Sequence, residues 1–338
     1  ERVSAQLLLW TASGAEGVEV EVEPFRSDGH TLPEDAARAR FVRYVLSDEF
    51  GNKCGYHDPA IYPPHPVPDM LDDIEVFDIK ARSVRPVWIT VSIPADAPAG
   101  EYASTVKVYA KGRQLRTFDI GLTVIGRELP PPAEWNYYLD LWQHPAAVAR
   151  VEGLDLWSDA HFEALVPYMR LLADAGQKVV TTTLNKDPWN NQCFDAYADM
   201  IVWTKNADGS WSYDYTVFDR WVELMTGLGI DRTINCYSML PWNNELHYRD
   251  GSTGRFVDVT ADPGTPAFEA LWEPFLTDFT GHLREKGWLG RTNIAMDERS
   301  PEEMTDALSL LRKTAPELGI AMADNKNSYL NYPFINSM

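Results

Sequence analysis

The stretch RTNIAMDERSPEEMTDALSLLRKTAPELGIAMAD, residues 291 to 324, decides between the fold classes open to this chain. It begins with a short apolar run that ends on two adjacent acids, Asp297 and Glu298. Ser300 and Pro301 then give a helix-start signal, because a serine side chain can accept a hydrogen bond from the free N–H groups of a first turn. A second apolar run, IAMAD, follows the helical stretch. Strand, helix and strand in this order predict a β-α unit with parallel strands.

The same alternation extends back to about residue 131. The apolar runs WNYYLDLW, KVVTTTL and RTINCYSML each precede an amphipathic stretch, which gives five strands and four helices in all. Large loops follow the second and third strands, and this favours a barrel over a doubly wound sheet. Since a closed barrel has eight strands, we expect residues 131–338 to form a (β/α) TIM-type barrel that is truncated at its C-terminal end. A barrel that is incomplete by nature is the alternative.

The first third of the chain has the pattern of an all-β unit. GVEVEVEPF, residues 17–25, alternates valine with glutamate, as a half-buried strand does. Further β-branched runs are separated by ADAPAG and KGRQ, whose proline and glycine suit turns. We therefore predict an antiparallel β-sandwich over residues 1–130, with the prolines 130–132 as the connection to the second domain. The proline-rich stretch YHDPAIYPPHPVPDM, residues 56–70, is predicted to be an ordered loop.

Composition limits the kinds of partner. The net charge of −20 argues against nucleic acid and against an anionic membrane surface. No run reaches the ~20 apolar residues that a spanning helix needs, so no membrane insertion is expected. The chain opens without a leader, and a secreted, periplasmic or cytoplasmic location and the oligomeric state all stay open. The 12 tryptophans and 15 tyrosines suit either a core or the stacking platforms of a sugar-binding cleft.

The motifs of cofactor and metal enzymes are missing from the sequence. Three cysteines cannot form a disulfide framework, and no CxxC pair offers a zinc site. HExxH, GxSxG and a phosphate-binding glycine loop do not occur. Metal, serine-nucleophile and nucleotide mechanisms therefore have no support from the sequence motifs.

Asp297 and Glu298 are the first candidates for a site, because barrel enzymes place their catalytic groups at the carboxyl ends of the strands. Strict alternation along a strand would point the two acids to opposite faces. Both reach one ligand only if the backbone bends or bulges between them. In the alternative interpretation one acid is catalytic or structural and the other caps the helix that begins near Pro301.

Other strand ends supply polar and aromatic candidates. In YYLDLWQHP, Asp140, Trp142 and His144 share a parity, although a histidine there is often a hydrogen-bonded scaffold residue. The loop after the second strand contains Trp189 and a hairpin turned at Asp208-Gly209. Asn244-Glu245 in the third loop superficially resembles the Asn-Glu pair of many sugar-cleaving barrels. The side chains predicted to contact substrate are Asp140, His144, Trp189, Tyr237 and Trp242.

Four segments together resemble a known family. GYHDPAIYPP, IPADAPAGEYASTVKV, YYLDLWQHP and the MDE triplet occur in the order found in glycoside hydrolase family 123, the β-N-acetylgalactosaminidases. The resemblance covers nearly the whole chain, and the family has further barrel strands where this sequence ends. It implies a retaining enzyme in which the 2-acetamido group of the sugar is the nucleophile. Glu298 would then be the general acid/base, and Asp297 would hold the acetamide, on a glycan or glycolipid with terminal β-linked N-acetylgalactosamine.

Two rival functions remain open at this point. A two-carboxylate β-glycosidase would use Glu298 together with Glu245 and would not require an acetamido sugar. A non-catalytic relative would bind the glycan without cleaving it.

Overall fold

A computed structural model describes residues 1–47, 60, 63–324, 330–332 and 335. The chain divides into two compact units, Glu1–Leu129 and Pro130–Met338. Part of the proline-rich loop predicted at 56–70 lies outside the described residues. Its end is not a loop, because the strand β6 (His65–Asp72) begins within it and pairs with β5 (Ala37–Ser47) at the edge of a sheet, where prolines are tolerated.

The first unit consists of two antiparallel sheets. One has the order β1-β8-β5-β6, and the other has the order β4-β3-β9-β2-β7 with β10 paired to β9. Ile89 and Val91 of the first sheet lie in one buried cluster with Tyr102 and Val106 of the second, so the sheets pack face to face. The all-β character predicted for this region is thus found. The remaining strands are β1 (Arg2–Thr11), β2 (Ala15–Val22), β3 (Arg26–Ser27), β4 (His30–Thr31), β7 (Phe77–Ile79), β8 (Ser83–Ser92), β9 (Gly100–Ala110) and β10 (Arg113–Val124).

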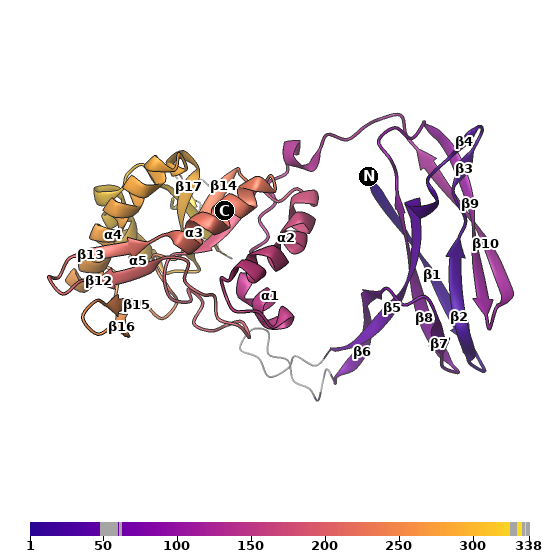
Figure 1. Cartoon of the computed structure of the whole chain (residues 1–338), viewed down its shortest axis with the longest axis horizontal. Helices are drawn as coiled ribbons and strands as arrows, with labels where there is room; N and C mark the ends of the chain where they lie inside the picture. Colours follow the sequence, from indigo (N-terminus) through magenta and orange to yellow (C-terminus); the bar gives the residue numbers. More distant parts are fainter. Residues whose placement is uncertain (48–59, 61–62, 325–329, 333–334, 336–338) are drawn as a thin grey trace. The chain divides into compact units, whose positions relative to one another are not determined.

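The second unit is built on a parallel sheet with the order β11-β14-β17-β18. Its strands are β11 (Val179–Thr183), β14 (Thr233–Tyr237), β17 (Thr292–Asp297) and β18 (Gly319–Ala323). The helices α2 (Asp159–Asp174), α3 (Thr216–Gly227), α4 (Pro266–Glu285) and α5 (Pro301–Thr314) alternate with them (Figure 1). None of the helices in the described part of the chain is long and apolar enough to cross a membrane.

The two faces of this parallel sheet differ in chemistry. Ile234, Cys236, Ile294 and Met296 belong to the main apolar core, together with side chains of α3, α4 and α5. The opposite face carries three rows of register partners: Thr181, Asn235, Asn293 and Gly319, then Thr183, Tyr237, Ala295 and Ala321, then Asp297 and Ala323. This second face is polar or small, and Asp297 stands at its carboxyl end.

The first strand predicted for this unit, WNYYLDLW, is not a strand. It makes one isolated parallel bridge, Leu139 to Gln177. The side chains of two buried glutamines replace the backbone hydrogen bonds that a paired strand would make here. The Leu141 N–H donates to Gln177 Oε1 (2.9 Å), and the Thr181 N–H donates to Gln143 Oε1 (2.8 Å). The parallel sheet therefore has four strands among the described residues, and a TIM barrel is not confirmed. A short helix that the sequence did not predict, α1 (Pro145–Glu152), follows directly.

The long loops after β11 and β14 form a second sheet of their own. The predicted hairpin at Asp208-Gly209 joins β12 (Val202–Lys205) to β13 (Trp211–Asp214). The loop after β14 adds β15 (Glu245–Asp250) and β16 (Phe256–Thr260), and β12 pairs with β15 in parallel (Figure 1). Trp203 of β12 stacks on Phe275 of α4 with ring centroids 4.3 Å apart. Both loops are thereby attached to the helical layer.

Gly176, which follows α2, allows a test of this fold. Its φ is +87°, and a Cβ there would lie 2.8 Å from Cε3 of Trp135. Gly153, after α1, has φ +66° and open space around it. We expect Gly153→Ala to lower the free energy of unfolding by about 1–2 kcal/mol, the cost of the left-handed conformation. Gly176→Ala should cost roughly 1–3 kcal/mol more, because the methyl group overpacks the indole.

Chemical denaturation of both variants measures this difference. The indole of Trp135 is held by its Nε1–H bond to the Pro130 carbonyl oxygen (2.7 Å), so it cannot move away freely. Equal losses for the two substitutions would contradict the packing of Trp135 against Gly176.

Candidate active site

Asp297 brings two of the predicted aromatic residues together. The residue as a whole is only 8% exposed. The Trp189 Nε1–H donates to Asp297 Oδ2 (2.7 Å), and the Trp242 Nε1–H donates to the Asp297 backbone oxygen (3.2 Å). Because Trp189 follows β11 and Trp242 follows β14, these bonds join the ends of three strands.

Burial shifts the titration of Asp297. Desolvation raises the pKa of its carboxyl from 3.8 to about 6, the Trp189 hydrogen bond opposes this shift, and the charge of Glu298 adds to it. Desolvation disfavours the charged form, whereas a hydrogen bond to the carboxylate favours it. A carboxyl with a raised pKa at the end of a parallel strand has the character of a functional group rather than of a surface charge.

Glu298 lies on the far side of a backbone bend. Its φ is +49°, a left-handed value that is uncommon for a residue other than glycine. The side chain is exposed, and the backbone N–H donates to the Ala323 carbonyl oxygen of β18 (2.9 Å). The break in alternation that both acids need to reach one ligand therefore occurs at Glu298 itself.

The helix after the acid pair has its own cap. Ser300 Oγ accepts a hydrogen bond from the Glu303 N–H (3.3 Å), and the Glu303 carboxylate accepts one from the Ser300 N–H (3.1 Å). This capping box closes the start of α5. The alternative in which Asp297 or Glu298 serves as the helix cap is therefore wrong.

An aromatic cluster lies beside Asp297. The ring centroids of Trp142, Trp189 and Tyr237 are 4.9–5.1 Å apart, and Tyr197 lies 4.5 Å from Trp189. Trp189 and Tyr237 are each 2% exposed, which counts against both as open stacking surfaces. Burial, with the charges of Asp140 and Asp297, raises the pKa of Tyr237. Trp142 is 38% exposed and gives the cluster its accessible face.

Asp140 contacts the polar face at the row of Asn235 and Asn293, farther from the carboxyl end of the sheet than Asp297. Its Oδ2 accepts a hydrogen bond from Asn235 Nδ2 (3.3 Å), and Asn235 Oδ1 accepts one from Asn293 Nδ2 (2.9 Å). Burial raises the pKa of Asp140 to about 6, and the Asn235 bond opposes that shift. Asp140 and Asp297 thus each add a charge near Tyr237, from different depths.

His144 contacts the site indirectly. Its ring stacks on Tyr197 at 3.9 Å, and its Nε2 lies 3.4 Å from the Ala196 carbonyl oxygen. Since Tyr197 contacts Trp189, His144 supports the loop that carries this indole. The position agrees with the scaffold interpretation of this histidine.

Several contributors had only faint signals in the sequence. Asn235 and Asn293 interrupt two apolar strands at equivalent positions, and a polar residue inside a buried strand is a signal of this kind. Trp142 shares the parity of Asp140 and His144 along the chain, but it was not among the side chains predicted to contact substrate. Tyr197 lies within the long loop after β11 and carried no signal at all.

Glu245, the alternative partner for Glu298, has a different environment. Its Oε2 accepts a hydrogen bond from Lys186 Nζ (2.5 Å), and the same ammonium group also bonds Asp258 (2.9 Å). Glu245 therefore belongs to an ion-pair cluster on β15 and β16, with its charge balanced by a lysine.

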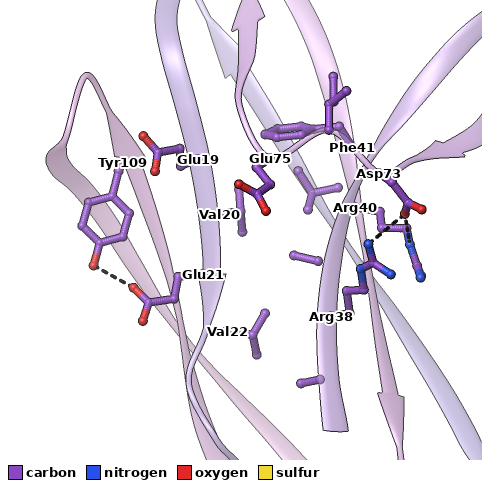
Figure 2. A pocket seen from close by; sticks show the side chains of 14 residues that line it. Glu19, Val20, Glu21, Val22, Arg38, Arg40, Phe41, Asp73, Glu75 and Tyr109 are labelled. Carbon is purple, nitrogen blue, oxygen red and sulfur yellow. Dashed lines mark hydrogen bonds and ion pairs between the residues drawn. The ribbon is translucent and has the colours of Figure 1, made fainter. Parts of the chain in front are cut away.

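A separate cavity of about 440 Å³ lies in the first unit, between residues of β2 and β5. Figure 2 shows Arg38 and Arg40 beside Asp73 (3.1 and 2.8 Å), and Tyr109 donating to Glu21 (3.1 Å). Its arginines are thus already paired within the protein. None of the residues predicted to act on substrate belongs to this unit.

Comparison with known proteins identifies both units. Residues 142–336 match the family model of the glycoside hydrolase 123 catalytic domain, and residues 1–110 match that of the glycoside hydrolase 123 N-terminal domain. No curated protein matches the sequence significantly.

A solved structure agrees with these family models. A family 123 glycoside hydrolase from Clostridium perfringens, described in connection with glycolipid glycan hydrolysis, has 28% sequence identity and a TM-score of 0.87. The alignment covers 99% of this chain and 60% of that one, so the chain spans about three-fifths of its relative. A family 39 glycoside hydrolase from Bacteroides cellulosilyticus WH2 has 12% identity and a TM-score of 0.31 over 91% of this chain and 48% of its own, too low to carry an argument. The two family models together show that the chain belongs to glycoside hydrolase family 123.

Proposed function

We propose that this protein is a retaining exo-glycosidase that removes terminal β-linked N-acetylgalactosamine from glycans or glycolipids by substrate-assisted catalysis. The observation that carries the proposal is the acid pair: a buried Asp297 hydrogen-bonded by Trp189, followed across a left-handed bend by an exposed Glu298. Family membership and the similarity to an enzyme of glycolipid glycan hydrolysis support it.

The two acids would divide the chemistry between them. The acetamide oxygen of the substrate attacks the anomeric carbon as the bond to the leaving oxygen breaks. Glu298 donates its proton to that oxygen and later removes one from the attacking water. Asp297 accepts a hydrogen bond from the acetamide N–H and stabilises the positive charge of the oxazolinium intermediate. Two displacements at the anomeric carbon give net retention, without a metal or organic cofactor.

The environments of the two acids suit these roles. Electrostatic stabilisation is worth more where water is excluded, and Asp297 is buried. A general acid/base has to reach both the leaving oxygen and the attacking water, and Glu298 is exposed. The accessible face of Trp142 lies next to Trp189 and Tyr237, where the apolar side of a sugar ring could pack.

We also propose that the four parallel strands belong to a TIM-type barrel formed by residues 131–338. Their consecutive order and their all-parallel pairing are those of neighbouring barrel strands. The polar face that ends at Asp297 would then be the barrel interior, and the acid pair would lie at its carboxyl-terminal mouth. Residues 1–130 would form the separate sandwich domain.

The two-carboxylate alternative is less well supported. An ordinary retaining mechanism needs a second carboxylate ~5 Å from the first, free to attack the sugar. Glu245 is bonded to Lys186, and this ion pair would have to break first. The non-catalytic alternative would require binding of N-acetylgalactosamine by the full-length protein with no turnover.

Substitution of the two acids in the full-length protein tests the proposed roles. General acid/base catalysis is worth ~10²–10⁴-fold, so Glu298→Gln should lose about that factor on a natural glycan. An aryl glycoside with an acidic phenol hardly needs protonation, so this variant should keep much of its glycosylation rate there. Asp297→Asn should stay slow on both substrates, because the acetamide must still attack. Pre-steady-state and steady-state rates on the two substrates measure the difference.

The wild type supplies the control. A substrate whose acetamido group is replaced by hydroxyl should not be turned over. Comparable cleavage of this 2-hydroxy glycoside would show that the acetamide is not the nucleophile, and Glu245 would become the residue to substitute.

The raised pKa of Asp297 predicts a stability effect with a definite sign. Its folded-state pKa of about 6 lies above the ordinary 3.8, so the folded protein binds this proton more tightly than the unfolded chain. The contribution of Asp297 to stability therefore falls as the pH rises from about 4 to about 6 and is level above that. Asparagine keeps an oxygen for the Trp189 bond but has no charge to desolvate.

We expect Asp297→Asn to melt at a higher temperature than the wild type above pH 6, by a few degrees, with the difference vanishing near pH 4. Thermal unfolding across this range measures it, with the exposed Asp155→Asn as the matched control. A gap between wild type and Asp297→Asn that does not change with pH would show that desolvation of this carboxyl is not the cause.

A further inference from the structure

Arg299 directly follows the acid pair, and its side chain is only 9% exposed. One guanidinium nitrogen, Nη1, donates to the Trp242 carbonyl oxygen (3.1 Å). The other, Nη2, donates to Asn244 Oδ1 (2.9 Å) and pairs with the Glu303 carboxylate. A single buried cation thus links the end of β17, the loop after β14 and the first turn of α5.

The loop that Arg299 holds leads back to Asp297. The Trp242 backbone N–H donates to the Pro188 carbonyl oxygen (2.9 Å), and its indole N–H donates to the Asp297 backbone oxygen (3.2 Å). The next residue after Pro188 is Trp189, whose indole bonds the Asp297 carboxylate. Arg299, Trp242, Trp189 and Asp297 therefore form a closed ring of contacts across three strand ends.

Glu298 lies between two fixed points of this ring. On one side Asp297 is held by the two indoles, and on the other side Arg299 is held by its three acceptors. A left-handed residue other than glycine persists only where its surroundings enforce it. The anchored Arg299 side chain supplies that enforcement from the C-terminal side, and the Glu298 N–H bond to Ala323 supplies it from the neighbouring strand.

We infer that Arg299 is a positioning residue that sets the direction of Glu298 and the placement of Trp242 against Asp297. The inference rests on the proposed function, since it assigns Arg299 to the general-acid step. An arginine is needed because its planar fork reaches separate acceptors at the same time, which a lysine ammonium cannot do in one fixed geometry. Arg299 acts through Glu298 and Trp242 and does not itself act on the sugar, so its loss should lower kcat by a larger factor than it raises KM.

The experiment compares Arg299→Gln, Arg299→Lys and a control, Ser300→Ala, in the full-length protein. Ser300→Ala weakens the capping box of α5 but leaves the contacts of Arg299 with Trp242 and Asn244 in place. Misplacement of a catalytic group by ~1 Å can cost ~10²-fold. We expect Arg299→Gln to lower kcat by about 10–10²-fold on an N-acetylgalactosaminide with an alkyl leaving group, and clearly less on one with an acidic phenol. Arg299→Lys should fall between, and Ser300→Ala should keep wild-type kcat.

Three results would overturn the assignment. The first is an equal loss on both leaving groups, in proportion to lowered thermal stability. The second is a loss of kcat in Ser300→Ala as large as that in Arg299→Gln. The third is a crystal structure of Arg299→Gln in which Glu298 keeps its positive φ and the Trp242 indole still bonds the Asp297 oxygen. If the wild type cleaves no acetamido glycoside, the proposed function fails, and this crystal structure alone decides the positioning role.

Discussion

The burial of one carboxyl group, that of Asp297, is the constraint on which the arrangement of the second unit depends. Transfer of a carboxylate out of water costs several kcal/mol unless hydrogen bonds replace the lost solvent. Among the described residues the bond to its carboxylate comes from a neutral indole, Trp189, and no ion pair with a lysine or arginine is present. A nearby cation would hold the pKa low, whereas one indole N–H leaves it at about 6.

An indole N–H can stabilise a buried carboxylate only if the loop that carries the indole is rigid. Trp189 and Trp242 come from the two longest connections of the unit, and a mobile loop would not hold an N–H group within hydrogen-bond distance. The sheet formed by β12, β13, β15 and β16 meets this requirement, because it joins the two loops through backbone pairing. The stacking of Trp203 on Phe275 then attaches that sheet to α4. The hairpins are therefore part of the support of the acid pair.

The features that the sequence predicted correctly are those with a local pattern. Alternating valine and glutamate in residues 17–25 indicated a sheet with one buried face, and Ser300 followed by Pro301 indicated a helix start. Residues 135–142 show the same apolar pattern as a strand, yet the Gln177 side chain accepts the Leu141 N–H and the Gln143 side chain accepts the Thr181 N–H in place of strand pairing. The parallel pairing of β12 with β15 likewise joins residues 45 positions apart in the sequence, such as Thr204 and Arg249. Contacts between residues far apart in the sequence produce no local pattern. The burial of Trp189, which bonds Asp297 108 positions away, could not be predicted for the same reason.

The contrast between Asp297 and Glu245 shows how environment rather than residue type separates the roles of two acids. Asp297 ends the parallel strand β17, whereas Glu245 is the first residue of β15 in the loop that follows β14. Glu245 is neutralised by Lys186, so its negative charge is already compensated and its capacity to attack a sugar is reduced. Asp297 keeps an uncompensated charge in a site from which water is largely excluded. A cation that develops beside Asp297 would therefore gain more stabilisation than one beside Glu245, and this difference supports the role proposed for Asp297.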